Sequence, residues 1–140
     1  MKVSVDPSAV SLLTEVGPQQ FLSWTQGAQL CFPNLDEGRL LSGEENPEAV
    51  ANFLTGYYGE VALKLGRAGS IWARKGEPSV FLPGLSVEMI DSTGAGDAFA
   101  AGFLSEWLKG ASPLQALITG TQLGAKVAAQ PGARPTPPQT

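Results

Sequence analysis

The chain has 140 residues, of which 43% are apolar, and its 9 Lys and Arg stand against 13 Asp and Glu for a formal net charge of −4. This length suits about one domain, and an acidic balance without a basic run argues against binding to nucleic acid or to an anionic membrane. Because the sequence holds no His and a single cysteine, Cys31, it excludes Ser-His and Cys-His nucleophiles, a disulfide within the chain and a thiolate zinc site.

Apolar periodicity and turn residues predict short strands that alternate with helices. The expected strands cover residues 3–5, 30–32, 61–65, 70–74, 80–82 and 87–89. The expected helices cover residues 7–21 with a break near Gly17 and Pro18, 35–43, 47–56, 95–109 and 113–127. The strands 61–65 and 70–74 are joined by a tight turn and are expected to form a hairpin.

This alternation predicts an α/β sheet with helices packed on its faces. The three tryptophans, Trp24, Trp72 and Trp107, are expected to pack in the core or between elements. Residues 131–140 form a Pro-rich tail that is expected to be loosely structured. Residues 3–6 are typical of an interior strand that enters its turn, so we expect the chain to begin within a larger fold.

The strongest local pattern is the segment 91–99, Asp-Ser-Thr-Gly-Ala-Gly-Asp-Ala-Phe, between an expected strand and a long helix. Its glycines let the backbone approach a ligand, and the helix start presents free N–H groups, so the segment predicts an anion site. Asp97 places a carboxylate at the mouth of this site, where it can act as a general base. The alternative is that Asp91 and Asp97 are a helix cap and a first-turn acid.

The same segment resembles the second signature of the ribokinase-like (PfkB) carbohydrate kinases. Residues 33–37 resemble the Asn-x-x-Glu motif of that family, residues 64–69 resemble its strand and turn along the nucleotide, and Gly132-Ala133 resembles its closing Gly-Ala. The resemblance implies a three-layer α/β/α sandwich, of which this chain would be the C-terminal half of the sheet with flanking helices and a hairpin. Residues 1–130 would then be the nucleotide-binding and catalytic part.

The resemblance also implies a reaction, the transfer of a phosphoryl group from ATP to a hydroxyl of a sugar or sugar-like substrate. Asp97 would accept the proton of the hydroxyl, and the amides of Gly94, Ala95 and Gly96 would stabilise charge on the transferred group.

The nucleotide and the metal ions have their own implied residues. Glu37 would hold Mg²⁺ through water, and Asp91 and Thr93 match a loop that in many members helps to form a site for a monovalent cation such as K⁺. The residues that the resemblance places along the nucleotide are Asn34, Lys64, Gly66, Gly69, Gly96 and Thr121.

Each of these motifs also has a purely structural interpretation. Asn34 and Glu37 have the spacing of a capping box, in which each side chain accepts a hydrogen bond from the backbone of the other residue. Gly66 and Gly69 can simply close a hairpin, and Thr121 in a helix is most often a packing residue.

Two functional hypotheses follow. In the first, the chain is the catalytic half of an ATP-dependent kinase that acts on a small sugar or nucleoside. In the second, it is a catalytically incomplete module that binds a nucleotide or a partner. An unrelated anion-binding protein is a third reading, which requires the motif matches to be coincidental.

The location and the partners of the chain are also expected from its sequence. No apolar run approaches the ~20 residues of a membrane span, and the first residues lack the apolar stretch of a signal peptide, so we expect a cytoplasmic protein. The exposed sheet is expected to be covered by a missing N-terminal half or by a second copy of the chain.

Overall fold

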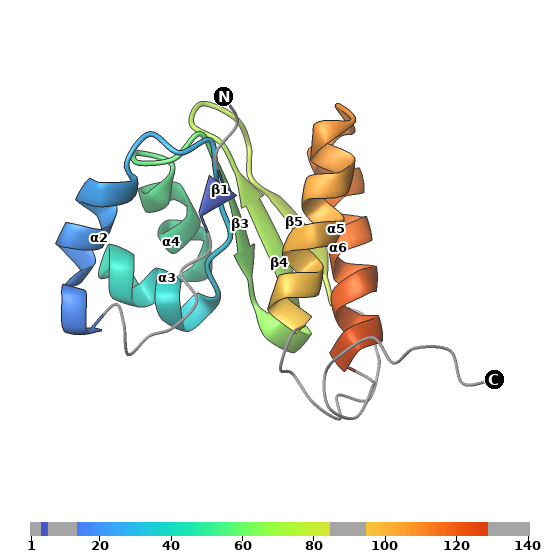
Figure 1. Ribbon diagram of the computed structural model, residues 1–140, viewed down its shortest axis with the longest axis horizontal. Coiled ribbons are helices and arrows are strands. Elements are labelled where there is room, and N and C mark those ends of the chain that lie inside the picture. The colour runs from blue at the N-terminus through green and yellow to red at the C-terminus, as the bar shows by residue number, and fades with distance from the viewer. Residues whose placement is uncertain (1–3, 6–13, 85–94, 129–140) are drawn as a thin grey trace. The chain divides into compact units, whose positions relative to one another are not determined.

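The computed structural model describes residues 4–5, 14–84 and 95–128, and these residues form two compact units (Figure 1). The first unit runs to residue 66 and also contains residues 70–81. The second unit contains residues 67–69 and the chain from residue 82 onward. The expected strand 87–89 and the Pro-rich tail 131–140 lie outside the described residues.

The strands form one sheet in the order β1-β2-β3-β4-β5. Its strands are β1 (Ser4–Val5), β2 (Leu30–Cys31), β3 (Glu60–Lys64), β4 (Gly69–Ala73) and β5 (Val80–Pro83). The pairs β1–β2 and β2–β3 are parallel, whereas β3 and β4 are antiparallel and form the expected hairpin. The two hairpin strands begin one residue earlier than the sequence predicts, because Lys64 is already paired with Ser70 and the backbone turns at Gly66.

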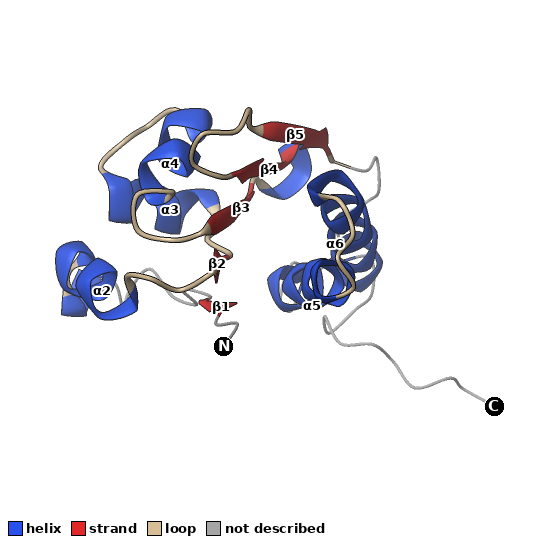
Figure 2. Cartoon of the chain, turned by 90° about the horizontal axis from the view of Figure 1, so that it is seen from above, coloured by secondary structure: helices blue, strands red, loops and turns tan. Residues whose placement is uncertain are grey.

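Three helices of the first unit lie on one side of the strands β1 to β4 (Figures 1 and 2). They are α2 (Pro18–Thr25), α3 (Leu35–Ser42) and α4 (Pro47–Leu54). The break before α2 falls at Gly17, as expected, where the backbone φ is +96°. The start of α4 is set by Asn46, whose side chain accepts hydrogen bonds from the backbone N–H groups of Glu48 and Ala49.

Both faces of the β3–β4 hairpin are buried. Val61 and Leu63 belong to the core cluster on the helix side, while Trp72 on the other face is 3% exposed and donates from Nε1 to Glu60 at 2.8 Å. Helix α3 approaches the sheet closely at Gly38, where a Cβ atom would lie 3.1 Å from the Leu63 side chain. A strand with two buried faces carries a nearly continuous apolar run, as residues 61–63 do.

Trp24 corrects one sequence expectation, because its side chain is 67% exposed rather than packed. Helix α2 instead turns Leu22 into the core, where it is 3% exposed. Trp24 lies two residues further along the helix, or about 200° around its axis, and therefore faces away from the core.

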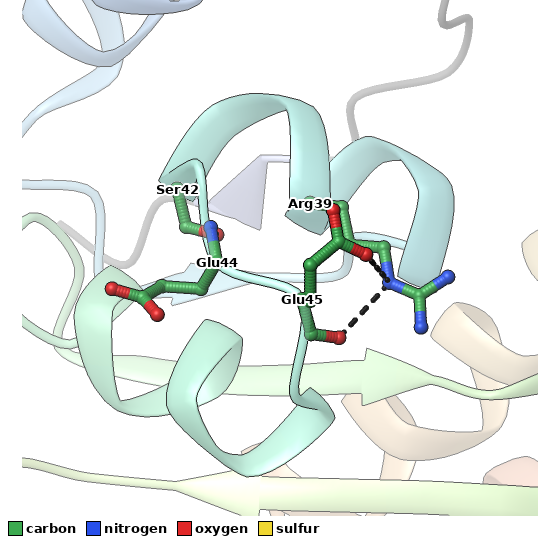
Figure 3. Close-up of polar contacts among 4 residues, drawn as sticks. All are labelled: Arg39, Ser42, Glu44 and Glu45. Atoms are coloured by element: carbon green, nitrogen blue, oxygen red, sulfur yellow. Dashed lines mark hydrogen bonds and ion pairs between the residues drawn. The ribbon is translucent and has the colours of Figure 1, made fainter.

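The end of α3 is stabilised by local polar contacts (Figure 3). Arg39 donates from Nε to the backbone oxygen of Glu45 at 3.0 Å and forms an ion pair with the Glu45 carboxylate at 3.5 Å. Gly43 ends the helix in a left-handed conformation with φ +73°, and the Ser42 hydroxyl accepts from the Glu44 N–H group at 3.1 Å. These contacts are exposed, so each stabilises the helix end only weakly.

The second unit contains two helices, α5 (Ala95–Leu108) and α6 (Pro113–Ala128), which lie side by side (Figure 2) and run in opposite directions (Figure 1). The turn between them uses Gly110 at φ +80°, the residue predicted to end the first of the two helices. Ser112 then begins α6 by accepting a hydrogen bond from the Gln115 N–H group at 3.2 Å. Among the described helices, none combines the length and the apolar character that a bilayer crossing requires.

Tyr58 provides a test of the core of the first unit. Its side chain is 2% exposed, and its hydroxyl lies 2.6 Å from the Thr25 hydroxyl. Burial raises the pKa of Tyr58 from 10.0 to about 12. Between these two values the unfolded chain has lost the phenol proton and the folded chain still holds it, so the free energy of unfolding is expected to fall as the pH rises from 10.0 to about 12.

The measurement is an ultraviolet titration of tyrosinate in the Tyr57→Phe variant, in which Tyr58 is the remaining one of the 2 tyrosines. We expect a midpoint close to 12 for the folded chain and close to 10.0 in denaturant. The control, Tyr58→Phe, should remove this part of the pH dependence of unfolding. A folded-state midpoint at the ordinary tyrosine value would contradict the burial described above.

Candidate functional site

The loop between β2 and α3 carries the expected pair Asn34 and Glu37. The Asn34 side chain accepts from the Glu37 N–H group at 2.8 Å, and Glu37 Oε1 accepts from the Asn34 N–H group at 2.9 Å. This is the capping box that the sequence left open as the structural alternative. Glu37 is 3% exposed, whereas Asn34 is exposed. The structure thus confirms the structural interpretation of the pair, and the role of Glu37 toward a metal ion stays a prediction.

Strand pairing brings Lys64 beside Asn34. Asn34 and Lys64 form an isolated parallel bridge beyond the ends of β2 and β3, and the Lys64 N–H group donates to the Pro33 carbonyl at 2.9 Å. Asn34, Glu37 and Lys64 therefore gather at the carboxyl ends of two parallel strands. This edge of a parallel sheet is the usual place for ligands in α/β proteins.

The turn after Lys64 is a single 3₁₀ turn, η1 (Gly66–Ala68), followed by Gly69. Gly66 and Gly69 have φ values of +61° and +120°, which residues with a side chain rarely adopt. A Cβ atom on Gly69 would overlap the Leu82 carbonyl oxygen, and one on Gly84 would overlap the Arg67 carbonyl oxygen. The Gly84 N–H group also donates to the Ala68 carbonyl at 3.2 Å. The turn is therefore held against the end of β5 by direct contact between two stretches of backbone.

In the second unit, the expected catalytic residue Asp97 is exposed in the first turn of α5. The first N–H groups of a helix have no partner within the helix, so Ala95, Gly96 and Asp97 can present donors to an anion. An acid in this position also interacts favourably with the helix dipole, which keeps the structural alternative open. The predicted residues Asp91, Thr93 and Gly94 lie outside the described residues.

Thr121 lies on α6 with its Oγ1 atom buried and, within the described parts of the chain, without a hydrogen-bond partner. A hydroxyl that serves only packing in a helix usually bonds to the carbonyl one turn earlier. The Thr121 hydroxyl lacks this usual hydrogen bond, and its contact with a ligand stays a prediction.

Two residues near the site were missed by the sequence analysis. Ser70 is 1% exposed and sits opposite Lys64 in the β3–β4 register, and its hydroxyl has no hydrogen-bond partner among the described residues. The available signal was a serine within an otherwise apolar strand. Gly84 has no role in the sequence prediction, and its contact with Arg67 arises from chain segments 17 positions apart.

Within the described ranges, no group of three or more Cys, Asp or Glu side chains could hold a metal ion directly. The oxygen atoms of Asn34 and Glu37 are nevertheless of the type that Mg²⁺ prefers, since this ion is usually held by one or two carboxylates together with water and phosphate oxygens.

Comparison with known proteins gives a family match over nearly the whole chain. The sequence profile of the pfkB family of carbohydrate kinases matches residues 4–140. The chain is 40% identical over 103 residues to a 2-dehydro-3-deoxygluconokinase of Bacillus subtilis. This alignment covers 72% of this chain and 32% of that protein. The chain is 33% identical over 132 residues to an uncharacterized sugar kinase of Archaeoglobus fulgidus, which covers 94% of this chain and 52% of that protein. The chain thus spans about a third of the first relative and about half of the second.

Solved structures show the same fold. The adenosine kinase of Sinorhizobium meliloti matches with a TM-score of 0.87 and 26% identity, over 96% of this chain and 41% of that one. A putative ribokinase II of Escherichia coli, solved in complex with ATP and Mg²⁺, matches with a TM-score of 0.80 and 26% identity, over 94% and 44% of the two chains. These likenesses confirm the expected α/β fold of the ribokinase type.

The contact between η1 and β5 can be tested by adding one methyl group. Gly84→Ala should destabilise the chain by about 1–3 kcal/mol, because the new Cβ overlaps the Arg67 carbonyl and backbone must move to admit it. The measurement is urea unfolding of the 140-residue chain.

The comparison variant is Gly76→Ala, since Gly76 has no atom within 4 Å of its Cβ position, although it has φ +83° whereas Gly84 has no left-handed φ. This control carries only the backbone strain of about 1–2 kcal/mol. The description of η1 would be wrong if Gly84→Ala left the free energy of unfolding unchanged.

Proposed function

Because the chain belongs to the pfkB family of carbohydrate kinases, we propose that it supplies the nucleotide-binding and catalytic part of an enzyme that transfers a phosphoryl group from ATP to a hydroxyl of a sugar or nucleoside. Residues 1–130 would form this part, with 131–140 as a tail. The names of the relatives support this class of acceptor, since they include a 2-dehydro-3-deoxygluconokinase and an adenosine kinase.

The observation that carries the proposal is the exposed carboxylate of Asp97 in the first turn of α5. An acid here gains little from packing, and it stands beside N–H groups that can bind an anion. This combination of a base and backbone donors suits phosphoryl transfer, which depends mainly on positioning and on electrostatic stabilisation.

In the proposed reaction, Asp97 accepts the proton of the substrate hydroxyl as its oxygen forms a bond to the terminal phosphorus of ATP. The bond between that phosphorus and the bridging oxygen breaks, and ADP leaves with the bond's electron pair. The N–H groups of Ala95 and Gly96, together with that of Gly94, stabilise the negative charge on the transferred group.

The nucleotide is proposed to lie along the carboxyl ends of β2 and β3. The Lys64 ammonium would interact with its phosphates as a point charge, and Asn34 and the turn 66–69 would contact it with polar side-chain and backbone groups. Thr121, with its buried and unpartnered hydroxyl, is a further proposed contact.

Mg²⁺ is the proposed metal cofactor, and when bound it neutralises charge on the phosphates. Glu37 and Asn34 offer suitable oxygen atoms, and Glu37 would act through a bound water, because its Oε1 already accepts a hydrogen bond from Asn34. K⁺ at Asp91 and Thr93 stays a prediction, as do a cytoplasmic location and a homodimer.

The role of Asp97 is tested by Asp97→Asn in the protein as produced from its own gene. We expect kcat for ATP-dependent phosphorylation to fall by about 10²–10⁴-fold, because the amide cannot accept the proton. The substrates to try are 2-dehydro-3-deoxygluconate, ribose and adenosine, with release of ADP as the readout.

The matched control is Glu48→Gln, which removes the first-turn acid of α4 in the same way. If both variants keep wild-type kcat, Asp97 is a structural acid and the assignment is wrong. Binding of Mg-ATP by calorimetry without turnover of any substrate would instead favour a catalytically incomplete nucleotide-binding module.

The Glu37→Gln variant distinguishes the role of Glu37 in the capping box of α3 from its proposed role in holding Mg²⁺. Glutamine supports a capping box as glutamate does, so the melting temperature should stay close to that of the wild type. The loss of the negative charge should raise the Mg²⁺ concentration needed for half-maximal activity by about 10–100-fold.

Titration of activity with MgCl₂ at saturating ATP gives this number. Glu37→Ala serves as the comparison, since it removes both the cap and the charge and should also lower the melting temperature. An unchanged Mg²⁺ requirement in Glu37→Gln would restrict Glu37 to its role in the cap.

A further inference from the structure

Helices α5 and α6 touch through their backbones at three successive levels. Each level has a glycine on which a Cβ atom would approach a carbonyl oxygen of the other helix: Gly102 opposite Thr119 at 2.9 Å, Gly120 opposite Phe99 at 2.8 Å, and Gly124 opposite Ala95 at 3.1 Å. All three glycines are buried. The distance between the two helices is therefore set by backbone atoms.

The third level differs from the others by its position. Ala95 is the first residue of α5 and lies two residues before Asp97. The Ala95 carbonyl and the Gly96 N–H group belong to one planar peptide unit, so a push on the oxygen also displaces or tilts the N–H group. That N–H group is one of the donors at the helix start, where no earlier carbonyl of the helix is available to pair with it.

We propose that Gly124 of α6 is a positioning residue for the first turn of α5. Because Gly124 has no side chain, α6 packs directly against the Ala95 carbonyl and fixes the position of the Ala95–Gly96 peptide plane. In this position the Gly96 N–H group contacts the transferred phosphoryl group, and Asp97 contacts the substrate hydroxyl. This inference rests on the proposed kinase function.

A purely structural role of the glycines makes a different prediction. If the glycines only allow the helices to pack, then substitution at any of the three levels should affect stability and leave the catalytic rate alone. If Gly124 aims the first turn, then a methyl group at Gly124 should lower the rate, and one at Gly102 should not.

The experiment compares Gly124→Ala with Gly102→Ala in the protein as produced from its own gene. The added methyl at Gly124 requires a shift of a few tenths of an ångström at Ala95, and the one at Gly102 meets backbone at a shorter distance, so the control disturbs packing at least as strongly. Alanine also favours the helix more than glycine does, which offsets part of the crowding. Melting curves define a temperature at which both variants are folded.

At that temperature we expect Gly124→Ala to lower kcat by about tenfold, because small displacements of catalytic groups have large effects on rate. The proposed nucleotide contacts Asn34 and Lys64 lie in the first unit, so we expect the KM for ATP to change less than kcat does. Gly102→Ala should keep the wild-type kcat. Equal kcat values for the two variants would overturn the inference.

A second measurement separates this inference from the proposed function. In ¹H–¹⁵N spectra of the ¹⁵N-labelled protein, Gly124→Ala should shift the amide signals of Gly96 and Asp97, and Gly102→Ala should leave both in place. If the wild type phosphorylates no substrate, the proposed function fails, and these shifts still decide the positioning role. Unmoved Gly96 and Asp97 signals in Gly124→Ala would overturn it.

Discussion

The parallel pairing of β2 with β3 is the constraint on which the first unit depends. It places Cys31 beside Val61 and continues past Pro33 to bring Asn34 beside Lys64. A proline can accept a hydrogen bond but cannot donate one, and here its carbonyl receives the Lys64 N–H group. The chain can therefore leave the sheet after the Asn34–Lys64 bridge, and α3 begins at Leu35. This short transition carries the cap of α3 to the carboxyl edge of the sheet, where the nucleotide is proposed to lie.

The capping box of α3 shows how one pair of side chains can serve stability and function. The two hydrogen bonds between Asn34 and Glu37 satisfy backbone donors that the helix start leaves open, and they hold the Glu37 carboxylate in one orientation. A buried carboxylate that is held in this way is well suited to orient a metal-bound water. The structural interpretation of the motif is thus confirmed, and the proposed metal role builds on it.

Much of the fold could be predicted from local sequence because the signals are themselves local. Gly43 and Gly110 mark helix ends through their left-handed backbone, and Asn34 with Glu37 marks a helix start. The packing of Trp24 was predicted wrongly, because a side chain's burial depends on which face its helix turns to the core. Ser70 was missed, since nothing in a five-residue strand shows that the serine will stand opposite Lys64.

The sequence by itself determined the order of helices and strands, with several of their ends, which glycines occupy turns and which chemistry is available to a chain without His. These properties depend on residues within a few positions of one another. Only the tertiary structure decided that Asn34 meets Lys64, that Gly84 closes on Arg67, and that Gly124 touches the carbonyl of Ala95. Such contacts join residues between 17 and 30 positions apart, and they exist only after strands have paired and helices have packed.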